Sequence, residues 1–230
     1  MSASLLVELF TEELPPKALR HLGEAFGDGI LNGLIRAQLK APDRKKGVFA
    51  TPRRLAVLIP DVLPKASDRG ESKKLMPSKI AFGADGKPTA VLSRRLEREG
   101  ASLDQLERRV DGDAEYVFLN QTISGLTLVA GLQLALEDAI AKLPIPKVMS
   151  YQLADGATTV QFVRPGHGLV AMHGPMVVPV SVLGLKAGNV THGHRFQGVK
   201  DITIATAAAY EEALAAHGKV VASFDKRRER

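Results

Sequence analysis

Apolar and polar positions in the first quarter of the chain follow two different periods. Residues 5–10 form a short apolar run, and residues 48–59 contain alternating apolar positions on both sides of a proline-containing bend. These patterns predict one strand and, later, a pair of strands joined by a turn. Between them, apolar residues at spacings of three and four over residues 17–39 predict an amphipathic helix with one buried stripe.

Glycines interrupt this predicted helix. Each costs about 1 kcal/mol of helix stability relative to alanine. We therefore expect them to allow close packing of the helix against a sheet. They are Gly23, Gly27, Gly29 and Gly33.

The middle of the chain alternates between polar segments and periodic ones. Residues 61–79 are polar, charged and broken by prolines, which predicts a long internal loop. Pro88 is expected to open a helix that runs to about Glu99, and a second short helix follows where Ser102 and Gln105 have the spacing of a capping box. The remaining elements expected here are a strand at residues 115–123 and a helix at residues 127–143.

The second half is rich in predicted strands. Residues 159–198 carry short apolar blocks separated by turn-forming glycine, proline and asparagine, and residues 201–205 add another strand. Thr206 is placed to cap a helix that ends at Gly218. The fold class predicted from these patterns is α+β, with mixed or antiparallel sheets, flanking helices and a strand-rich second half. The predicted domains are an N-terminal α+β region at 1–146, a strand-rich region with one C-terminal helix at 147–222, and the start of a truncated helix at 223–230.

Composition places the chain among ordinary folded proteins. Its 230 residues are 45% hydrophobic and 24% charged, and it contains no cysteine, so disulfides and thiolate metal sites are excluded. The sequence has no recognisable export signal and no apolar run of about 18 residues, so we expect a cytoplasmic protein without a membrane partner.

The net charge of +6 permits a nucleic-acid partner without requiring one. Three tyrosines, eight phenylalanines and no tryptophan leave few platforms on which bases could stack. We therefore expect any RNA contact to involve backbone and shape more than splayed bases.

Catalytic and metal motifs are weak. No serine lies in a Gly-x-Ser-x-Gly elbow, and the adjacent carboxylates Glu12 and Glu13 are expected at a helix N-terminus, where the helix dipole favours them. His192 and His194 would share one face of a strand, as a metal pair does, but no third ligand follows in register. We predict no catalytic acid or base and no metal site, with hydrogen-bonding histidines as the simpler interpretation.

Arginines beside proline or aromatic residues are the best candidates for phosphate contact. The guanidinium group offers a fixed fork of donors that matches phosphate oxygens. The alternatives for each are internal pairing with a carboxylate or a solvated position. These arginines are Arg53, Arg54, Arg164 and Arg195.

Six motifs follow one another along nearly the whole chain. They are residues 5–19 (LLVELFTEELPPKAL), 51–57 (TPRRLAV), 85–90 (DGKPTA), 142–149 (KLPIPKVM), 162–167 (FVRPGH) and 193–198 (GHRFQG). In this order and spacing they resemble the N-terminal part of the β subunit of bacterial heterotetrameric glycyl-tRNA synthetase. The resemblance implies that these residues correspond to about the first third of such a subunit.

The resemblance also implies a function. The complete α2β2 enzyme joins glycine to its tRNA with ATP and Mg²⁺, the catalytic core belongs to the α subunit, and the β subunit binds tRNA. We thus expect a fragment that is inactive alone, has no cofactor of its own, and has the α subunit and glycine tRNA as partners. The residues we select for contacts with RNA or between domains are Arg53, Arg54, Arg164, His167, His194 and Arg195.

Two alternatives remain open. The chain could be a subunit-docking scaffold that makes no RNA contact of its own, which predicts a large exposed apolar patch. It could also be a small metal-dependent enzyme built on the histidine cluster, which predicts stoichiometric metal.

Overall fold

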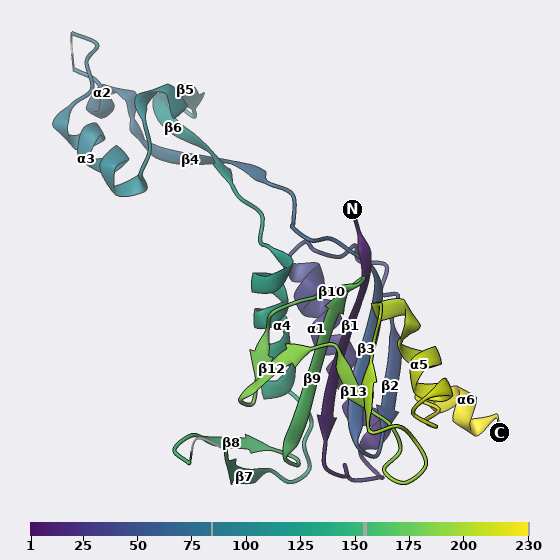
Figure 1. Cartoon of the computed structure of the whole chain (residues 1–230). Coiled ribbons are helices and arrows are strands. Elements are labelled where there is room, and N and C mark those ends of the chain that lie inside the picture. Colours follow the sequence, from purple (N-terminus) through teal and green to yellow (C-terminus); the bar gives the residue numbers. More distant parts are fainter. Residues whose placement is uncertain (84, 154–155, 230) are drawn as a thin grey trace. The chain divides into compact units, whose positions relative to one another are not determined.

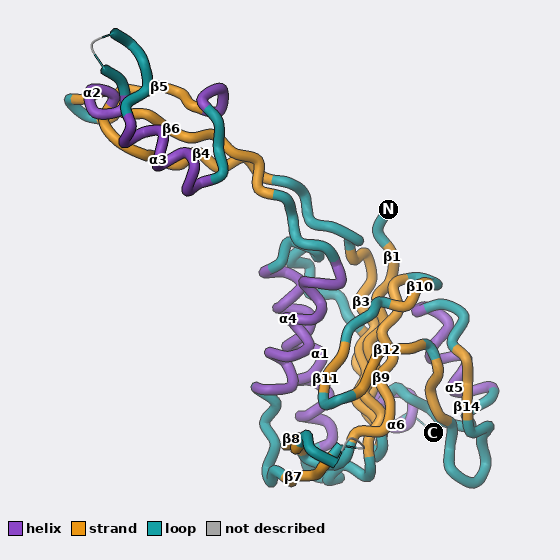
Figure 2. Tube along the Cα trace, turned by 60° about the vertical axis from the view of Figure 1, so that its left-hand side comes forward, coloured by secondary structure: helices purple, strands orange, loops and turns teal. Residues whose placement is uncertain are grey.

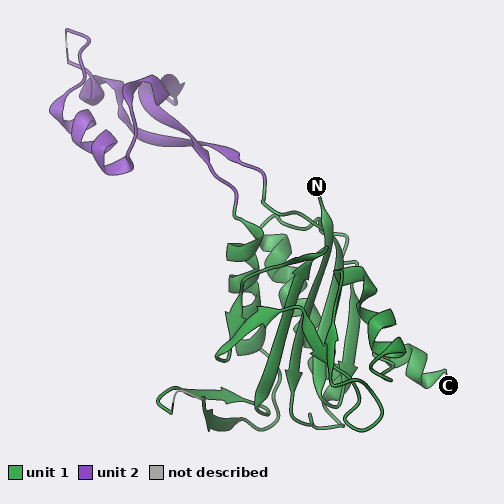
Figure 3. Cartoon of the chain, viewed as in Figure 1, with its two compact units in different colours: residues 1–66, 126–230 green, residues 67–125 purple. Residues whose placement is uncertain are grey.

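The computed structural model describes residues 1–83, 85–153 and 156–229. The chain forms two compact units, one made of Met1–Ala66 with Leu126–Arg230 and the other of Ser67–Gly125 (Figure 3). The sequence predicts a domain boundary after residue 146, which differs from the boundaries between these two units. Strands from both sides of that position share one sheet, so the first unit is closed by residues that follow the inserted second unit.

The first unit is organised around a seven-stranded sheet with the order β11-β12-β9-β1-β3-β2, in which β10 also pairs with β9 (Figure 1). Its strands are β1 (Ala3–Thr11), β2 (Gly47–Thr51), β3 (Arg54–Val62), β9 (Gly166–His173), β10 (Met176–Val177), β11 (Ser181–Val182) and β12 (Leu185–Gly188). Neighbouring strands are antiparallel except β12 and β9, which are parallel. Strand β1 lies between β3 and β9, so its hydrogen-bonding edges are both paired.

The two faces of β1 serve two different cores. Leu5, Val7 and Leu9 point to one face, where α1 (Leu19–Arg36) and α4 (Leu128–Ala141) lie side by side over the sheet (Figure 2). Leu6 points to the opposite face and packs in a second cluster. This alternation follows from the period of two in a strand.

The C-terminal part of the chain covers the second face. It contributes β13 (Val190–His192), β14 (Asp201–Thr203), the short helix η2 (Ala207–Ala209) and α5 (Tyr210–Ala216), followed by α6 (Phe224–Arg228). Ile202, Ile204 and Leu214 are buried there against Leu6 and Met172. A separate hairpin, β7 (Met149–Gln152) and β8 (Thr159–Phe162), precedes β9.

The second unit is a three-stranded antiparallel sheet with the order β4-β6-β5 and helices packed on it. Its elements are β4 (Arg69–Pro77), α2 (Ser78–Ala81), α3 (Ala90–Glu99), η1 (Leu103–Gln105), β5 (Leu106–Asp111) and β6 (Ala114–Ile123). Leu92 and Leu96 of α3 pack on Val117 and Leu119 of β6.

The predicted α+β class is confirmed, as are the strands and helices with clear periodicity. The predicted loop at 61–79 is wrong, because much of it forms β4, whose side chains are mostly exposed and therefore carry no apolar alternation. The short helix predicted after Ser102 is the 3₁₀ helix η1, which has the predicted capping box and is followed directly by β5. Thr206 precedes η2 without capping it through its side chain. Among the described helices, none combines the length and apolar character needed to cross a bilayer.

The glycines of α1 face two partners. A Cβ atom added to Gly23 or Gly27 would meet side chains of β2 at 2.8–2.9 Å, as expected for packing on a sheet. A Cβ atom on Gly33 would lie 2.9 Å from the Cα atom of Ala135 on α4, and Gly29 faces Ala139 in the same way. Gly29 and Gly33 therefore allow α1 to approach α4 closely. This helix–helix contact was not predicted from the sequence.

Gly33→Ala gives a test in which two effects have opposite signs. Helix propensity alone would stabilise the chain by about 1 kcal/mol, whereas overpacking against the backbone of Ala135 costs about 1–3 kcal/mol or more. We expect a net loss, measured as a lower urea midpoint at unchanged slope. Gly188→Ala is the control, because no atom lies within 4 Å of its added Cβ. A Gly33→Ala chain more stable than wild type would contradict the close packing of α1 on α4.

Candidate functional site

An open hollow at one end of the first unit gathers residues from distant parts of the sequence. It has a volume of about 430 Å³ and is lined by the turn between β2 and β3, the start of β9, and the loop after β13. Four of the six residues selected from sequence line it, together with Phe10, Glu12, His192, Gly193 and Lys200. The four are Arg53, His167, His194 and Arg195.

Glu12 connects two of these residues. The Nε2 atom of His167 lies 2.7 Å from Glu12 Oε1, and the Nη2 atom of Arg53 lies 3.6 Å from the same oxygen. Arg53 also lies over the ring of Phe10, with its Cζ atom 5.1 Å from the centroid. The expectation that Glu12 sits at a helix N-terminus is wrong, because α1 begins only at Leu19. Its carboxylate instead orients two cation-forming side chains at the rim of the hollow.

The loop formed by residues 193–199 is tied to the end of α5. The amide of His194 donates to Gly218 O at 2.7 Å, and the amide of Val199 donates to His217 O at 3.0 Å. A Cβ atom on Gly193 would lie 2.8 Å from Gly218 Cα, and one on Gly198 would lie 2.7 Å from Gly218 C. Glycine is required where two backbones approach this closely. The loop therefore presents its side chains from a fixed backbone.

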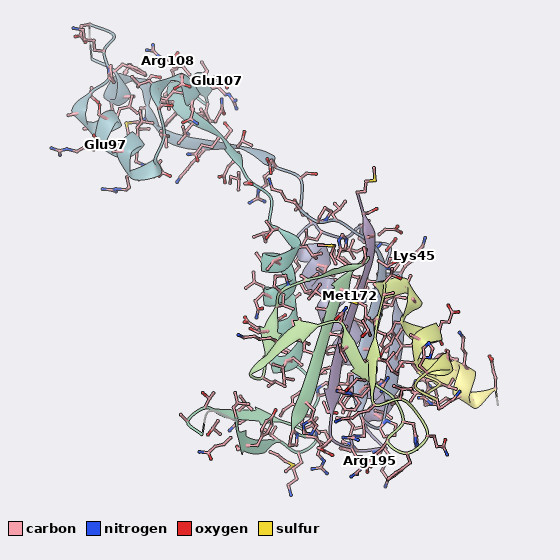
Figure 4. The ribbon with its side chains drawn as sticks, viewed as in Figure 1. Lys45, Glu97, Glu107, Arg108, Met172 and Arg195 are labelled. Carbon is pink, nitrogen blue, oxygen red and sulfur yellow. The ribbon has the colours of Figure 1, made fainter. Side chains whose placement is uncertain are left out.

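Arg195 and Phe196 extend from this loop, which Figure 4 shows by the label of Arg195 at the end of the unit. The Cζ atom of Arg195 lies 5.5 Å from the Phe196 ring centroid. Both residues also line an adjoining hollow of about 360 Å³, where Lys219 and Arg227 add further positive charge. The two hollows share Phe10, Arg53, Gly193, His194 and Arg195, and together they form one continuous basic surface.

Arg164 lies in a third hollow rather than in the first. Its Nε atom donates to the carbonyl oxygen of Glu13 at 3.1 Å, and its Nη1 atom lies 2.8 Å from the Sδ atom of Met149. Glu12 lines both that hollow and the first one, so Arg164 neighbours the basic surface without belonging to it.

The side chain of Arg54 points into the protein, toward Glu8, and is only 2% exposed. Its Nη1 atom lies 3.6 Å from Glu8 Oε2, and its Nη2 atom donates to the carbonyl oxygen of His192. Arg54 therefore has no surface to offer an RNA phosphate, and its selection for RNA contact is corrected by its burial. No local pattern predicts this burial, because Glu8 resembles any other polar residue in an apolar strand.

Glu8 is itself 1% exposed and receives donors from the segment that covers the second face of the sheet. The hydroxyls of Thr191 and Tyr210 both donate to its carboxylate. Burial, and next the negative charge of Glu8, raise the pKa of the Tyr210 phenol well above its ordinary value. The phenol consequently stays protonated and keeps donating.

The two neighbouring histidines have different partners. The Nδ1 atom of His192 lies 2.9 Å from Lys200 O and 3.0 Å from Asp201 Oδ1, whereas the Nδ1 atom of His194 accepts from the amide of Phe196 at 3.3 Å. Across residues 1–83, 85–153 and 156–229, no three His, Asp or Glu side chains gather as a metal-binding set. The contacts of His192 and His194 are hydrogen bonds of the kind that the simpler interpretation predicts.

Sequence reasoning did not select several residues of the basic surface. Lys200 and Lys219 carry no motif signal, and Arg227 lies in a charged run at the end of the chain. Phe196 enters the sequence analysis only as part of the motif at residues 193–198. The glycines at positions 193 and 198, combined with Gly218, are the one signal that could have indicated a fixed loop.

Tyr210→Phe tests the buried network. Loss of a hydrogen bond to a charged group is expected to lower the free energy of unfolding by about 1.5–3 kcal/mol. Because the pKa of Tyr210 is raised in the folded chain, the protonated phenol contributes its full stabilisation below the ordinary phenol pKa, near 10. This contribution is lost as the pH rises through the pKa of the folded state. The difference between wild type and variant should therefore shrink above about pH 10, measured by urea unfolding across pH.

Tyr151→Phe is the matched control. The hydroxyl of Tyr151 accepts from the neutral amide of Gly166 at 3.2 Å, so its removal should cost about 0.5–1.5 kcal/mol. Equal losses for the two variants would contradict the special role assigned to the Glu8 carboxylate.

Comparison with known proteins shows which family this chain is similar to. The family model described as "Glycyl-tRNA synthetase beta subunit" matches residues 5–230. Proteins named "Glycine--tRNA ligase beta subunit" from Janthinobacterium sp. (strain Marseille) and Acidovorax sp. (strain JS42) are 50% and 52% identical, each over 98% of this chain. The matched regions are 33% and 32% of those relatives, so the chain spans about a third of their length. The chain belongs to the glycyl-tRNA synthetase beta subunit family.

Proposed function

We propose that this chain is a non-catalytic, tRNA-binding part of a glycine–tRNA ligase. In this proposal the ligase couples glycine to tRNA with ATP and Mg²⁺, the chemistry belongs to a separate α subunit in an α2β2 assembly, and the basic surface described above holds the tRNA backbone. The observation that carries the proposal is the convergence of Arg53, Arg195 and Lys200 in one open hollow.

Charge supports an anionic partner. Across the two joined hollows the described lining has five arginine or lysine residues besides the buried Arg54, and two carboxylates. Glu12 is one of the two and is already paired with His167 and Arg53. Positive charge that exceeds local carboxylates attracts phosphates by Coulomb interaction and counterion release. Arginine also matches two phosphate oxygens at once.

The residues of the hollow do not fit ATP and Mg²⁺ chemistry on this chain. Mg²⁺ is held in proteins by carboxylates and substrate phosphates, and Glu12, the one carboxylate of the first hollow among the described residues, already has two partners. No step is therefore assigned to this chain through either group, and its role is to bind and orient RNA.

A docking scaffold without RNA contact remains the second candidate. The exposed side chain of Phe196 favours it, because exposed aromatic residues are often centres of protein interfaces. The same binding experiment separates the two candidates.

Binding of glycine tRNA and of an unrelated tRNA, each measured by fluorescence anisotropy over a range of salt concentrations, tests the proposal. We expect affinity to fall steeply with salt. Each phosphate contact removed makes the slope of log K against log salt shallower by about 0.7–0.9. Arg53→Ala with Arg195→Ala should therefore make the slope shallower by about 1.4–1.8.

Arg94→Ala is the control, because Arg94 is an exposed arginine of α3 in the other unit. It should leave the slope nearly unchanged. Stronger binding of glycine tRNA would add recognition to the role of this chain. Absence of binding to either tRNA would contradict the proposal and favour the docking scaffold.

A further inference from the structure

The side chain of Phe196 is 83% exposed, although it is apolar and cannot bind a phosphate. The next most exposed phenylalanine among the described residues, Phe224, is 40% exposed. The tyrosines of the described chain are all half-buried or buried. An aromatic side chain this exposed, at the rim of a hollow, marks a place where a ligand could cover it.

The backbone beneath Phe196 holds the ring away from the rest of the chain. Residues 193–199 are closed by a hydrogen bond from the Gly193 amide to Val199 O at 3.1 Å and another from the Gly198 amide to His194 O at 3.0 Å. The ring has Arg195 and His194 beside it, with centroid distances of 5.5 Å to the guanidinium and 6.3 Å to the imidazole. The side chain is therefore presented beside cations on a fixed loop.

The cations around Phe196 lack carboxylate partners. Within the described part of the chain, Arg195 and Lys219 form no ion pair. Arg227 donates to the carbonyl oxygens of Val221, Ala222 and Ala50, so its positive charge is likewise not neutralised by a carboxylate. Apolar surface from Val220 and Val221 lines the same hollow. A ligand that fits must be flat or apolar on one side and anionic on the other.

We propose that Phe196 is a stacking platform for an unpaired base, and that the basic surface therefore takes single-stranded RNA in preference to duplex. This inference rests on the proposed RNA-binding function and names the RNA class for that site. Every base has a face that stacks on an aromatic ring, and a single strand can place a base there while its phosphates contact Arg195 and Arg53. Inside a duplex the base faces are already stacked on one another and cannot reach the ring.

A protein surface is the other class of occupant for an exposed phenylalanine. It is disfavoured because the cores of protein interfaces are depleted in lysine, whereas Lys219 and several arginines line the hollow beside this ring, with Glu13 as its one described carboxylate.

The test measures binding of this chain to a fluorescein-labelled 12-nucleotide single-stranded RNA and to a 12-base-pair RNA duplex. Phe196→Leu keeps an apolar side chain of similar bulk and removes the aromatic face, while Phe196→Tyr keeps that face. Base stacking on an aromatic side chain is worth about 5- to 150-fold in affinity. We expect Phe196→Leu to weaken single-strand binding by this factor, with duplex binding unchanged and Phe196→Tyr close to wild type.

Met176→Leu is the matched control, because Met176 is 69% exposed and pairs with His173, at the opposite end of β9 from His167. It should bind single-stranded RNA as wild type does. Thermal unfolding of each variant checks that the fold is intact, which the exposure of Phe196 leads us to expect.

The outcomes separate this inference from the proposed function. If Phe196→Leu binds single-stranded RNA as wild type does while Arg53→Ala with Arg195→Ala weakens binding, the stacking platform is overturned and phosphate binding stands. Tighter binding of duplex than of single strand would also overturn the platform. If neither RNA binds wild type, and Phe196→Leu abolishes association with the α subunit, both proposals fail and the ring belongs to a protein interface.

Discussion

A carboxylate buried in the middle of the central strand constrains the whole first unit. Glu8 lies on β1 with hydrogen-bonded neighbours on both sides and almost no exposure. A charge in such a position is strongly unfavourable unless cations and donors surround it. Those groups come from β3, which supplies Arg54, and from β13 and α5, which supply Thr191 and Tyr210. The C-terminal segment must therefore dock on the second face of the sheet for Glu8 to be satisfied.

The same network reaches the candidate site through Arg54. Its guanidinium contacts Glu8 on one side and donates to the carbonyl oxygen of His192 on the other. His192 is the last residue of β13, and the loop that carries His194, Arg195 and Phe196 follows directly. The adjacent arginines consequently have different tasks. Arg54, the first residue of β3, is directed into the core and fixes the start of the loop, whereas Arg53 remains in the turn and faces the hollow.

Helices and strands that bury apolar side chains in a regular pattern could be predicted from the sequence, whereas elements without such a pattern could not. The helices α1 and α4 each bury a regular apolar stripe, and β1 is a continuous apolar run buried on both faces, so the pattern was sufficient. Strand β4 exposes most of its side chains and was mistaken for a loop, since a strand with little buried surface has no such pattern. At the site, residue type identified Arg53, His167, His194 and Arg195. The burial of Arg54 depended on a tertiary partner, Glu8, which no local pattern reveals.

The fixed loop and the unmatched charges point to the same kind of partner. A loop already ordered in the free chain requires little further loss of conformational entropy on binding, so more of the contact energy appears as affinity. The glycines at positions 193, 198 and 218 supply this order by allowing backbone to lie against backbone. The surrounding cations repel one another in the free chain, because Glu12 and Glu13 are the only described carboxylates that line the joined hollows. A rigid surface with a surplus of positive charge is relieved of that repulsion when a polyanion binds, and a neutral or cationic protein surface would not relieve it.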